Sequence, residues 1–277
     1  MHTSNHVNMW SVGFVLLVGV IALCLAAPAG GDTIVLSDLN ATMGIDLEAA
    51  TGMSSWTVDG TEQLKRQWFW LRVGGTGAES PLNSLALSSY TVSDGNFNAG
   101  NDRVVAKYTG ATLEVVLDVM LTGGSAGSGA SDLTESISIK NTSGDELSLH
   151  FFQYADFDLD GDATDASVSI TGSPANRAKQ SDGSSVSESI VTGEPDHFEV
   201  ATYSDILDAL TDGDADDLGD LAGPITDDDL TWAFQWDRVL SPGESLLISK
   251  KKNLVPEPGA LAILAIGAVA ALRRRRR

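Results

Sequence analysis

The sequence is almost free of cysteine, since Cys24 is the single one among 277 residues and lies in an apolar run near the N-terminus. Attachment of lipid to a cysteine needs a small residue directly before it, and Leu23 is large. A disulfide framework needs at least two cysteines and a thiolate metal site needs several, so both are excluded. Histidine is also scarce, because only His150 and His197 lie beyond the first ten residues.

Basic residues are few as well, with 17 Lys and Arg against 38 Asp and Glu. Five of them are the terminal arginines, and without these 12 basic residues remain against 38 acidic ones, a net charge of −26. Such a domain repels nucleic acid and anionic lipid, so neither is expected as a partner. The acidity suits a cation-rich extracellular setting, or serves solubility alone.

The N-terminal segment reads as a secretory signal peptide of residues 1–29. Residues 11–27 are almost wholly apolar, and Ala27 and Ala29 fit the small-residue pattern of a cleavage site, with the cut expected after Ala29. The preceding residues contain no Lys or Arg, only His2 and His6, which leaves a retained N-terminal anchor as the alternative.

The last 23 residues, 255–277, form a three-part tail. Prolines bracket a glutamate, 13 residues without a polar side chain follow at 260–272, and arginines end the chain. A helix of 13 residues covers ~20 Å, short of a ~30 Å hydrocarbon core, but snorkelling arginines extend its reach. The positive-inside rule keeps the arginines cytoplasmic, so a short C-terminal transmembrane helix is predicted. The membrane-stop residues are Arg273, Arg274, Arg275, Arg276 and Arg277.

This tail resembles the PEP-CTERM sorting signal of bacterial surface proteins, with Pro256, Glu257 and Pro258 as the sorting motif. The resemblance implies processing by exosortase, a membrane enzyme, and an association with extracellular polysaccharide and biofilm. The protein is therefore expected to be exported to the cell surface or matrix and anchored in the inner membrane only until the tail is processed. An ordinary tail anchor with an accidental Pro-Glu-Pro is the alternative.

Residues 30–254 are predicted to form an all-β ectodomain, a single β-sandwich that is jelly-roll-like or supersandwich-like. Short β-branched and aromatic runs alternate with Gly, Ser, Asn and Asp clusters, which is typical of sandwiches and barrels. A helical turn is expected at 203–210 and an acidic loop at 212–229, while the Gly/Ser loop 123–131 is expected to be mobile. The predicted strands are 33–36, 67–73, 85–92, 103–108, 113–121, 136–140, 146–159, 167–171, 185–191, 197–201, 232–240 and 245–249.

Two hairpins carry the clearest period-two alternation. The first joins 136–140 to 146–159 through an Asn-Thr-Ser-Gly-Asp turn, and the second joins 232–240 to 245–249 through Ser-Pro-Gly-Glu. Three lysines, 250–252, are expected to end the last strand. Parts of both hairpins are similar to segments of other PEP-CTERM ectodomains, which implies a β-sandwich and no established activity.

A run of acidic residues after the strand 146–159 matches the opening of a calcium loop, with Gly161 at the turn position. The twelfth position is Ser167 instead of Glu, and no helix flanks the run. A straight strand places alternate residues ~6.6 Å apart, so the chain must curl to gather them. Calcium and a strand exit with solvated carboxylates remain the two alternatives. The tentative calcium ligands are Asp156, Asp158, Asp160, Asp162 and Asp165.

No convincing catalytic constellation is present, so an enzyme is not expected. His150 and His197 read as surface residues, and the Gly-Gly-Ser-Ala-Gly match at 123–127 lacks the strand and helix that a nucleophile elbow needs. Trp68 and Trp70 point to one face of a strand, where they are either covered by a loop or form a platform for stacking sugars. The expected role is structural or adhesive, in contact with extracellular polysaccharide and with no cofactor unless calcium binds. A secreted carbohydrate-active enzyme or carbohydrate-binding module is the alternative, since facing carboxylates arise from spatial distance alone.

Overall fold

The computed structural model describes residues 31–165 and 167–257. The predicted signal peptide, the apolar run 260–272, Pro258 and the terminal arginines lie outside these ranges. Among the described residues, no helix is long and apolar enough to cross a membrane.

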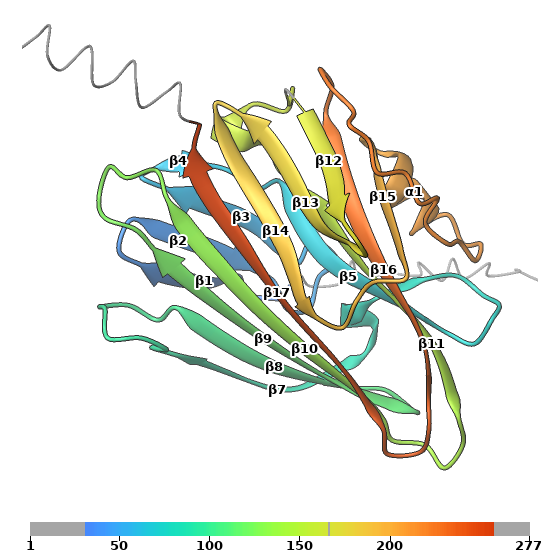
Figure 1. Ribbon diagram of the computed structural model, residues 1–277. Helices are drawn as coiled ribbons and strands as arrows, with labels where there is room; N and C mark the ends of the chain where they lie inside the picture. The colour runs from blue at the N-terminus through green and yellow to red at the C-terminus, as the bar shows by residue number, and fades with distance from the viewer. Residues whose placement is uncertain (1–30, 166, 258–277) are drawn as a thin grey trace, which may run out of the picture.

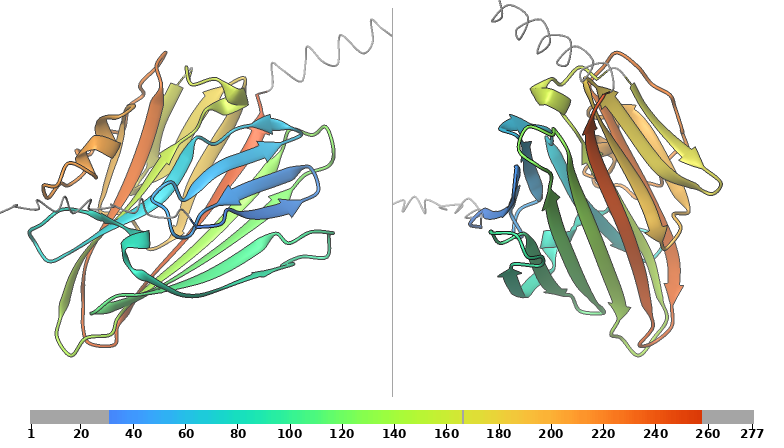
Figure 2. Two further views of the ribbon diagram at one scale, coloured as in Figure 1. Left: turned by 180° about the vertical axis from the view of Figure 1, so that it is seen from behind. Right: turned by 60° about the vertical axis from the view of Figure 1, so that its left-hand side comes forward.

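The strands of the described ranges form two antiparallel sheets that pack face to face (Figures 1 and 2), which confirms the predicted β-sandwich. The nine-stranded sheet has the order β1-β2-β3-β5-β11-β16-β15, with β4 paired to β3 and β6 to β5. Its strands are β1 (Ile34–Asp38), β2 (Ala41–Ile45), β3 (Met53–Val58), β4 (Thr61–Glu62), β5 (Arg66–Val73), β6 (Ser80–Pro81), β11 (Leu147–Asp156), β15 (His197–Thr202) and β16 (Leu230–Leu240).

The eight-stranded sheet has the order β12-β13-β14-β17-β10-β9-β8-β7. The predicted strands 103–108 and 113–121 are confirmed as β8 and β9, which pair with each other, whereas β2, β3 and β13 were not predicted. The strands of this sheet are β7 (Ala86–Ser93), β8 (Arg103–Thr109), β9 (Leu113–Gly123), β10 (Ser131–Asn141), β12 (Ser167–Gly172), β13 (Ala175–Asp182), β14 (Ser184–Thr192) and β17 (Ser245–Pro256).

Helical structure in the described part of the chain is limited to short pieces. The helix predicted at 203–210 is confirmed as α1 (Asp205–Ala209), which lies beside β15 (Figure 1). Two 3₁₀ turns, η1 (Leu82–Ser84) and η2 (Leu159–Gly161), connect strands.

Both predicted long hairpins are wrong in their pairing. β10 lies in the eight-stranded sheet and β11 in the nine-stranded sheet, and β16 and β17 are divided in the same way. Each tight turn therefore carries the chain across the sandwich, from one sheet to the other. Apolar and polar residues alternate along a strand whether it pairs with its neighbour in a hairpin or lies in the opposite sheet, because one face of the strand is buried in both cases.

Asn141 holds the two crossing turns together. Its buried Nδ2 donates to the carbonyl oxygens of Asp145 and Leu240, each at 2.8 Å. Its backbone N–H donates to Glu244 O at 2.9 Å, and its own carbonyl accepts from Gly243 N at 3.0 Å. The turns 141–146 and 241–244 are thus braced against each other at one end of the molecule.

The last strand does not end at the lysines. β17 continues to Pro256 as a central strand, paired with β10 on one side and β14 on the other. Lys250 and Lys252 point between the sheets and are 1% and 0% exposed, while Lys251 on the opposite face is exposed. The charged triplet thus extends the strand, because the two inward lysines meet carboxylates.

These carboxylates are Glu135 of β10 and Glu188 of β14, both fully buried. Lys252 Nζ lies 2.8 Å from Glu135 Oε2 and 2.9 Å from Glu188 Oε1. Lys250 Nζ lies 2.9 and 3.2 Å from the same two oxygens. We call Glu135, Glu188, Lys250 and Lys252 the buried quartet. Its two negative and two positive charges cancel within the core.

The opposite sheet completes the hydrogen bonds of the buried quartet. Gln67 Nε2 donates to Glu135 Oε1 at 2.6 Å, and Gln153 Nε2 donates to Glu188 Oε2 at 2.7 Å. The indole N–H of Trp232 also donates to Glu188 Oε2, at 2.9 Å. Every carboxylate oxygen of the quartet therefore has a donor, which is the condition under which buried charge is tolerated.

Aromatic side chains fill the core around the quartet. Phe69 stacks on Phe151 with ring centroids 5.6 Å apart, and Phe157 stacks on Trp232 at 5.2 Å. Such pairs add about 0.5–1.5 kcal/mol each beyond burial of their area. They span β5, β11 and β16, so the nine-stranded sheet supplies most of the aromatic core.

Candidate functional site

Three polar side chains form a row across neighbouring strands on the outer face of the nine-stranded sheet. Arg72 of β5 is opposite His150 of β11, and His150 is opposite Asp237 of β16. His150 Nδ1 lies 2.7 Å from Asp237 Oδ1. His197 of β15 reaches the other oxygen of Asp237, with Nε2 3.5 Å from Oδ2. The period-two alternation places His150 on the outer face of β11, and it places Asp237 on the same face of β16.

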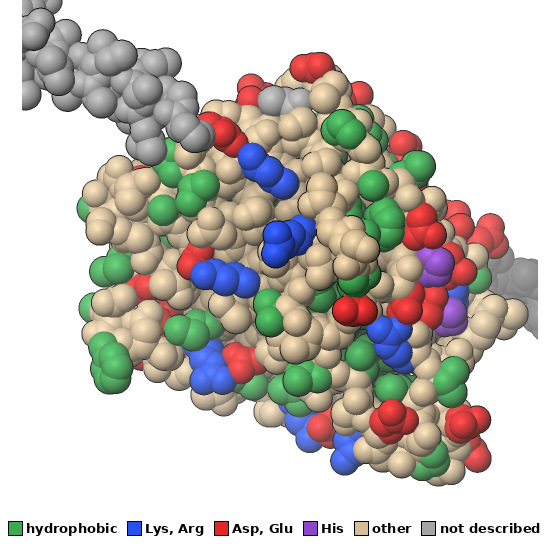
Figure 3. All heavy atoms as spheres, in the orientation of Figure 1, with side chains coloured by type: hydrophobic (Ala, Val, Ile, Leu, Met, Phe, Trp, Pro, Cys, Tyr) green, Lys and Arg blue, Asp and Glu red, His purple; other side chains and the backbone are tan. Residues whose placement is uncertain are grey.

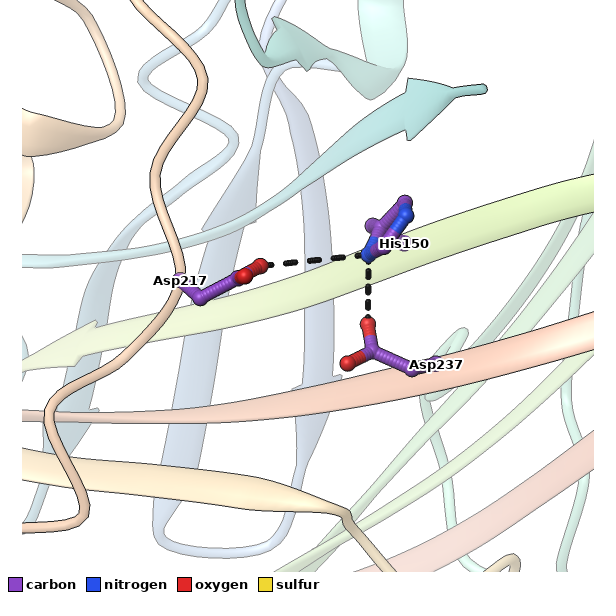
Figure 4. A group of neighbouring side chains, drawn as sticks. All are labelled: His150, Asp217 and Asp237. Atoms are coloured by element: carbon purple, nitrogen blue, oxygen red, sulfur yellow. Dashed lines mark hydrogen bonds and ion pairs between the residues drawn. The ribbon is translucent and has the colours of Figure 1, made fainter. Parts of the chain in front are cut away.

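The acidic loop 212–221 brings further carboxylates onto this row. Asp217 Oδ1 lies 3.8 Å from His150 Nδ1, and the two side chains point toward each other (Figure 4). Arg72 Nη2 donates to the same oxygen at 2.8 Å, and Gln235 Nε2 donates to it at 2.7 Å. On the molecular surface, histidines lie among carboxylates at one edge of the molecule (Figure 3). We call Arg72, His150, His197, Asp217, Gln235 and Asp237 the histidine face.

Opposing influences set the charges on the histidine face. Partial burial acts to raise the pKa of Asp217, but hydrogen bonds from Gln235 and Arg72 outweigh it and hold this pKa below its usual value. Burial acts to lower the pKa of His197, but Asp220, Asp237 and Asp217 raise it overall. A carboxylate beside a readily protonated imidazole is a pair that both accepts and donates hydrogen bonds at neutral pH.

The histidine face does not fit a metal ion well, although His150, Asp217 and Asp237 offer ligand atoms within 4.8 Å of one another. Gln235 Nε2 donates to Asp237 Oδ1 at 2.9 Å as well as to Asp217. The amide of Gln235 and the guanidinium of Arg72 thus occupy the oxygens that a cation would need. The arrangement is a closed hydrogen-bond network with exposed edges, since the side chain of Asp217 is 56% exposed.

A second group of carboxylates lies at the end of β11 and the start of β16. Asp156, Asp158 and Asp229 offer oxygens within 4.8 Å of one another. We call these three residues the acidic triad. Burial is the main reason that the pKa of Asp156 is raised to about 7, with the charges of Asp229 and Asp158 adding to it. Of the five tentative calcium ligands, the structure brings Asp156 and Asp158 together and adds Asp229 from the end of the acidic loop 212–229.

The other three tentative ligands are used differently. Asp160 Oδ1 accepts from Gln63 Nε2 at 3.2 Å and from Ser184 Oγ at 3.0 Å. Asp162 is exposed, and its Oδ1 accepts from Thr164 N at 3.0 Å within its own turn. Asp165 is fully buried, and its Oδ2 accepts from Leu230 N at 3.2 Å.

The proposed stacking platform is corrected by the burial of its rings. Trp68 and Trp70 are both 0% exposed, so neither offers a face to a sugar. Gly52, at φ +57°, comes so near that an added Cβ would lie 2.0 Å from the Trp68 ring. The alternative, coverage by a loop, is what the structure contains.

The sequence predicts both histidines as surface residues, and it does not reveal the carboxylates that lie beside them. Asp237 is 87 residues from His150 and belongs to β16, whose pairing with β11 was not predicted. Asp217 belongs to a loop that reads as solvated turns. The shared outer face of 147–156 and 230–240 was the available signal, since period two places His150 and Asp237 on the outward sides.

The first residues of the sorting motif are part of the sheet. Pro256 is opposite Ser184 in the β14–β17 ladder, and Glu257 N donates to Gly183 O at 2.8 Å. Lys179 Nζ lies 3.4 Å from Glu257 Oε1. The sandwich therefore extends into the motif, two residues beyond the predicted boundary at 254.

Residues 254–277 match the family model of the PEP-CTERM protein-sorting motif. The chain carries this motif. Its presence implies an exported, cell-surface-sorted protein that is processed by an exosortase-type membrane enzyme. No curated protein matches the sequence.

Solved structures resemble the chain in fold at low sequence identity. A bacterial glucoamylase complexed with acarbose has a TM-score of 0.55 at 10% identity, and the match covers 88% of this chain and 36% of that chain. The chain thus spans about a third of the glucoamylase. The Slr1438 protein of Synechocystis sp. PCC 6803 has a TM-score of 0.53 at 10% identity, covering 90% of this chain and 100% of that one. A candidate aldose 1-epimerase of Escherichia coli K12 has a TM-score of 0.50 at 12% identity, covering 82% and 99%. These likenesses concern the fold alone.

Proposed function

We propose that the protein is an exported surface or matrix protein that binds extracellular polysaccharide through the histidine face. The observation that carries this proposal is the concentration of planar hydrogen-bonding groups there. Carboxylates, an amide, imidazoles and a guanidinium lie side by side on four paired strands and the loop that follows β15. Sugars present vicinal hydroxyls that each donate and accept, and such mixed groups complement them.

Rigidity favours binding by this face. Arg72 is 5% exposed and is fixed by Glu79 Oε1 at 2.6 Å and Asp216 O at 2.9 Å. Gln235 bridges Asp217 and Asp237. These two buried side chains hold the more exposed Asp217 and Asp237 in place, so a ligand would meet carboxylates with fixed positions, which lowers the entropy cost of binding. The fold likeness to a glucoamylase and to a candidate epimerase, both named for sugar chemistry, is in keeping with a carbohydrate ligand.

The spacing of the carboxylates argues for binding over glycoside hydrolysis. The ligand oxygens of Asp217 and Asp237 lie within 4.8 Å of each other and share the donor Gln235. Glycosidases hold their carboxyl groups ~5–5.5 Å apart in retaining enzymes and ~6.5–9.5 Å apart in inverting ones, with the substrate between them. In this network the shared amide fills the space that a scissile bond would occupy.

Affinity electrophoresis through gels that contain bacterial exopolysaccharides tests the proposal. The ectodomain should be retarded, and Asp237→Asn should weaken retention about 10- to 100-fold, because a hydrogen bond to a charged group is lost. Asp145→Asn is the matched control, since Asp145 is exposed in the turn 141–146. Retention that is equal in wild type and Asp237→Asn would contradict the assignment of the binding face.

A second candidate function at the same face is mutarotation of an aldose. Asp237 lies between two imidazoles, with His150 on one oxygen and His197 toward the other. Ring opening and closure need only a proton donor and a proton acceptor, and half-buried imidazoles can supply both. Exchange NMR of glucose or galactose anomers would then show interconversion faster than in buffer, abolished by His150→Gln. If the anomers interconvert no faster with the protein than in buffer, mutarotation is excluded and binding remains the proposed function.

A further inference from the structure

The acidic triad sits where two strands of the nine-stranded sheet meet a connecting loop. Asp156 ends β11, Asp158 begins the following loop, and Asp229 directly precedes β16, the strand that pairs with β11. Pairing brings the end of β11 to the start of β16, so carboxylates more than seventy residues apart converge. We propose that Asp156, Asp158 and Asp229 bind one calcium ion.

Unpaired buried oxygens are independent support for a ligand at this place. Asp156 is 2% exposed, and its Oδ1 has no hydrogen-bond partner among the described residues. Asp229 Oδ1 is likewise buried and unpaired within the described ranges. The other oxygen of Asp156 has a long contact of 3.3 Å with the hydroxyl of Tyr154. Buried carboxylate oxygens without donors are costly, and a cation removes that cost.

The protein supplies little positive charge of its own to the acidic triad. Lys65 Nζ lies 3.7 Å from Asp158 Oδ2, but the Lys65 side chain is 65% exposed. Arg66 is opposite Asp156 in the β5–β11 ladder, but its Nη2 and Nε donate to Ala50 O at 2.7 and 3.2 Å and to no carboxylate of the triad among the described residues. An exposed lysine at this distance contributes little to holding three carboxylates together.

The chemistry of the ligands selects calcium. All three are carboxylates, which are hard oxygen donors, and the described residues place no imidazole in the triad. Two ligands come from one strand exit and one from another strand, so the geometry is irregular. Calcium accepts irregular shells of six to eight oxygens, whereas magnesium demands a near-ideal octahedron. Extracellular calcium sites work at ~10⁻⁴–10⁻³ M, which fits an exported protein.

This site is different from the calcium loop that the sequence run suggests. Asp162 belongs to that run but lies outside the acidic triad, whereas Asp229 belongs to the triad but lies outside the run. The two residues therefore separate the hypotheses. Asp229→Asn removes a proposed ligand, and Asp162→Asn is the matched control, because its amide oxygen can still accept from Thr164.

Calcium binding is measured on the ectodomain after removal of divalent ions with a chelator. Thermal unfolding should shift upward by about 5–10 °C at a calcium concentration a hundredfold above the dissociation constant. Terbium, which replaces calcium, should emit when tyrosine is excited, because the Tyr154 hydroxyl touches Asp156. Calcium should displace the terbium and quench this emission.

The variants have opposite expected signatures. Asp229→Asn should abolish the calcium-dependent shift and, without calcium, unfold at the same or a higher temperature than wild type, because one repelling charge is gone. A variant that merely damages the fold would unfold at a lower temperature. Asp162→Asn should respond to calcium like wild type.

Three results would overturn the proposal. The first is no shift and no terbium emission for wild type up to 10-fold above ~10⁻³ M calcium. The second is a lost response in Asp162→Asn with a retained response in Asp229→Asn. The third is an equal response to magnesium and calcium, which would remove the assignment of the ion.

Discussion

The buried quartet and the acidic triad both contain buried carboxylate oxygens, and they differ in what neutralises them. In the quartet, two lysines stand between two glutamates, and amide and indole N–H groups satisfy the remaining oxygens. In the triad, two buried oxygens lack a donor among the described residues, and the nearest lysine is exposed. The first group is complete within the chain, whereas the second is the group for which we propose a ligand from outside. Burial of charge alone therefore does not distinguish the two groups, whereas the hydrogen-bond partners of the buried oxygens do.

The largest effect is expected from Lys252→Met. The change leaves Glu135 and Glu188 with one lysine between them in the core, so a negative charge is uncompensated. The free energy of unfolding should fall by about 3–5 kcal/mol. Urea titration followed by tryptophan fluorescence measures it. A decrease of less than about 1 kcal/mol in the free energy of unfolding would mean that water reaches the quartet and screens its charges.

Acid should weaken the quartet next. Burial acts to raise the pKa of Glu188, but Lys250 and Lys252 outweigh it and hold this pKa below its usual value. A depressed carboxylate pKa gives stability that is present above the unfolded-state pKa of ~4.3 and is lost as pH falls toward the folded-state value. The free energy of unfolding should fall below pH ~4.3, and the fall should be smaller in Glu188→Gln by about 1–2 kcal/mol. Parallel curves for the two proteins would contradict this explanation.

A smaller effect of opposite sign is expected in the acidic triad. Asp156→Asn removes a charge that the chain does not pair, so the calcium-free protein should gain about 1 kcal/mol in the free energy of unfolding at pH 8. Saturating calcium should reverse the order, because only wild type then gains from the ion. Urea titrations with chelator and with calcium measure both values. A loss of stability in chelator would show that Asp156 is paired after all.

The smallest effect is expected from Lys251→Met, the matched control for Lys252. Lys251 lies between the two buried lysines in sequence but faces outward, where its Nζ lies 2.7 Å from Asp132 Oδ2 at the surface. An exposed ion pair contributes about 0–1 kcal/mol. A loss comparable with that of Lys252→Met would contradict the alternation of β17.

Alternation predicted the strands and their buried faces but not their partners. The runs 146–159 and 232–240 are both predicted as strands, yet each is paired through its turn with the neighbour in sequence. Only a contact such as that of Asn141 with Leu240 O distinguishes a crossing turn from a hairpin, and it links residues 99 apart. Propensity describes one strand at a time, whereas pairing depends on the whole sandwich.

The candidate sites were predictable in part for the same reason. Asp156 and Asp158 were singled out because they are close in sequence, and Asp229 was missed because β11 and β16 bring it there only after folding. The lysines 250–252 were interpreted as a polar strand end, because nothing in their own segment reveals Glu135 or Glu188. A pattern within one segment of the sequence does not predict contacts with residues in distant strands.

The position of β17 has a consequence for when the domain can fold. It is the last described strand, yet it lies at the centre of its sheet and joins β14 to β10. Without residues 245–256, the strands β12–β14 and β7–β10 have no hydrogen-bonded ladder between them. Glu135 and Glu188 then also lack the lysines that neutralise them. Because residues 245–256 lie close to the C-terminal tail, the eight-stranded sheet can be completed only after almost the whole ectodomain sequence has been synthesised.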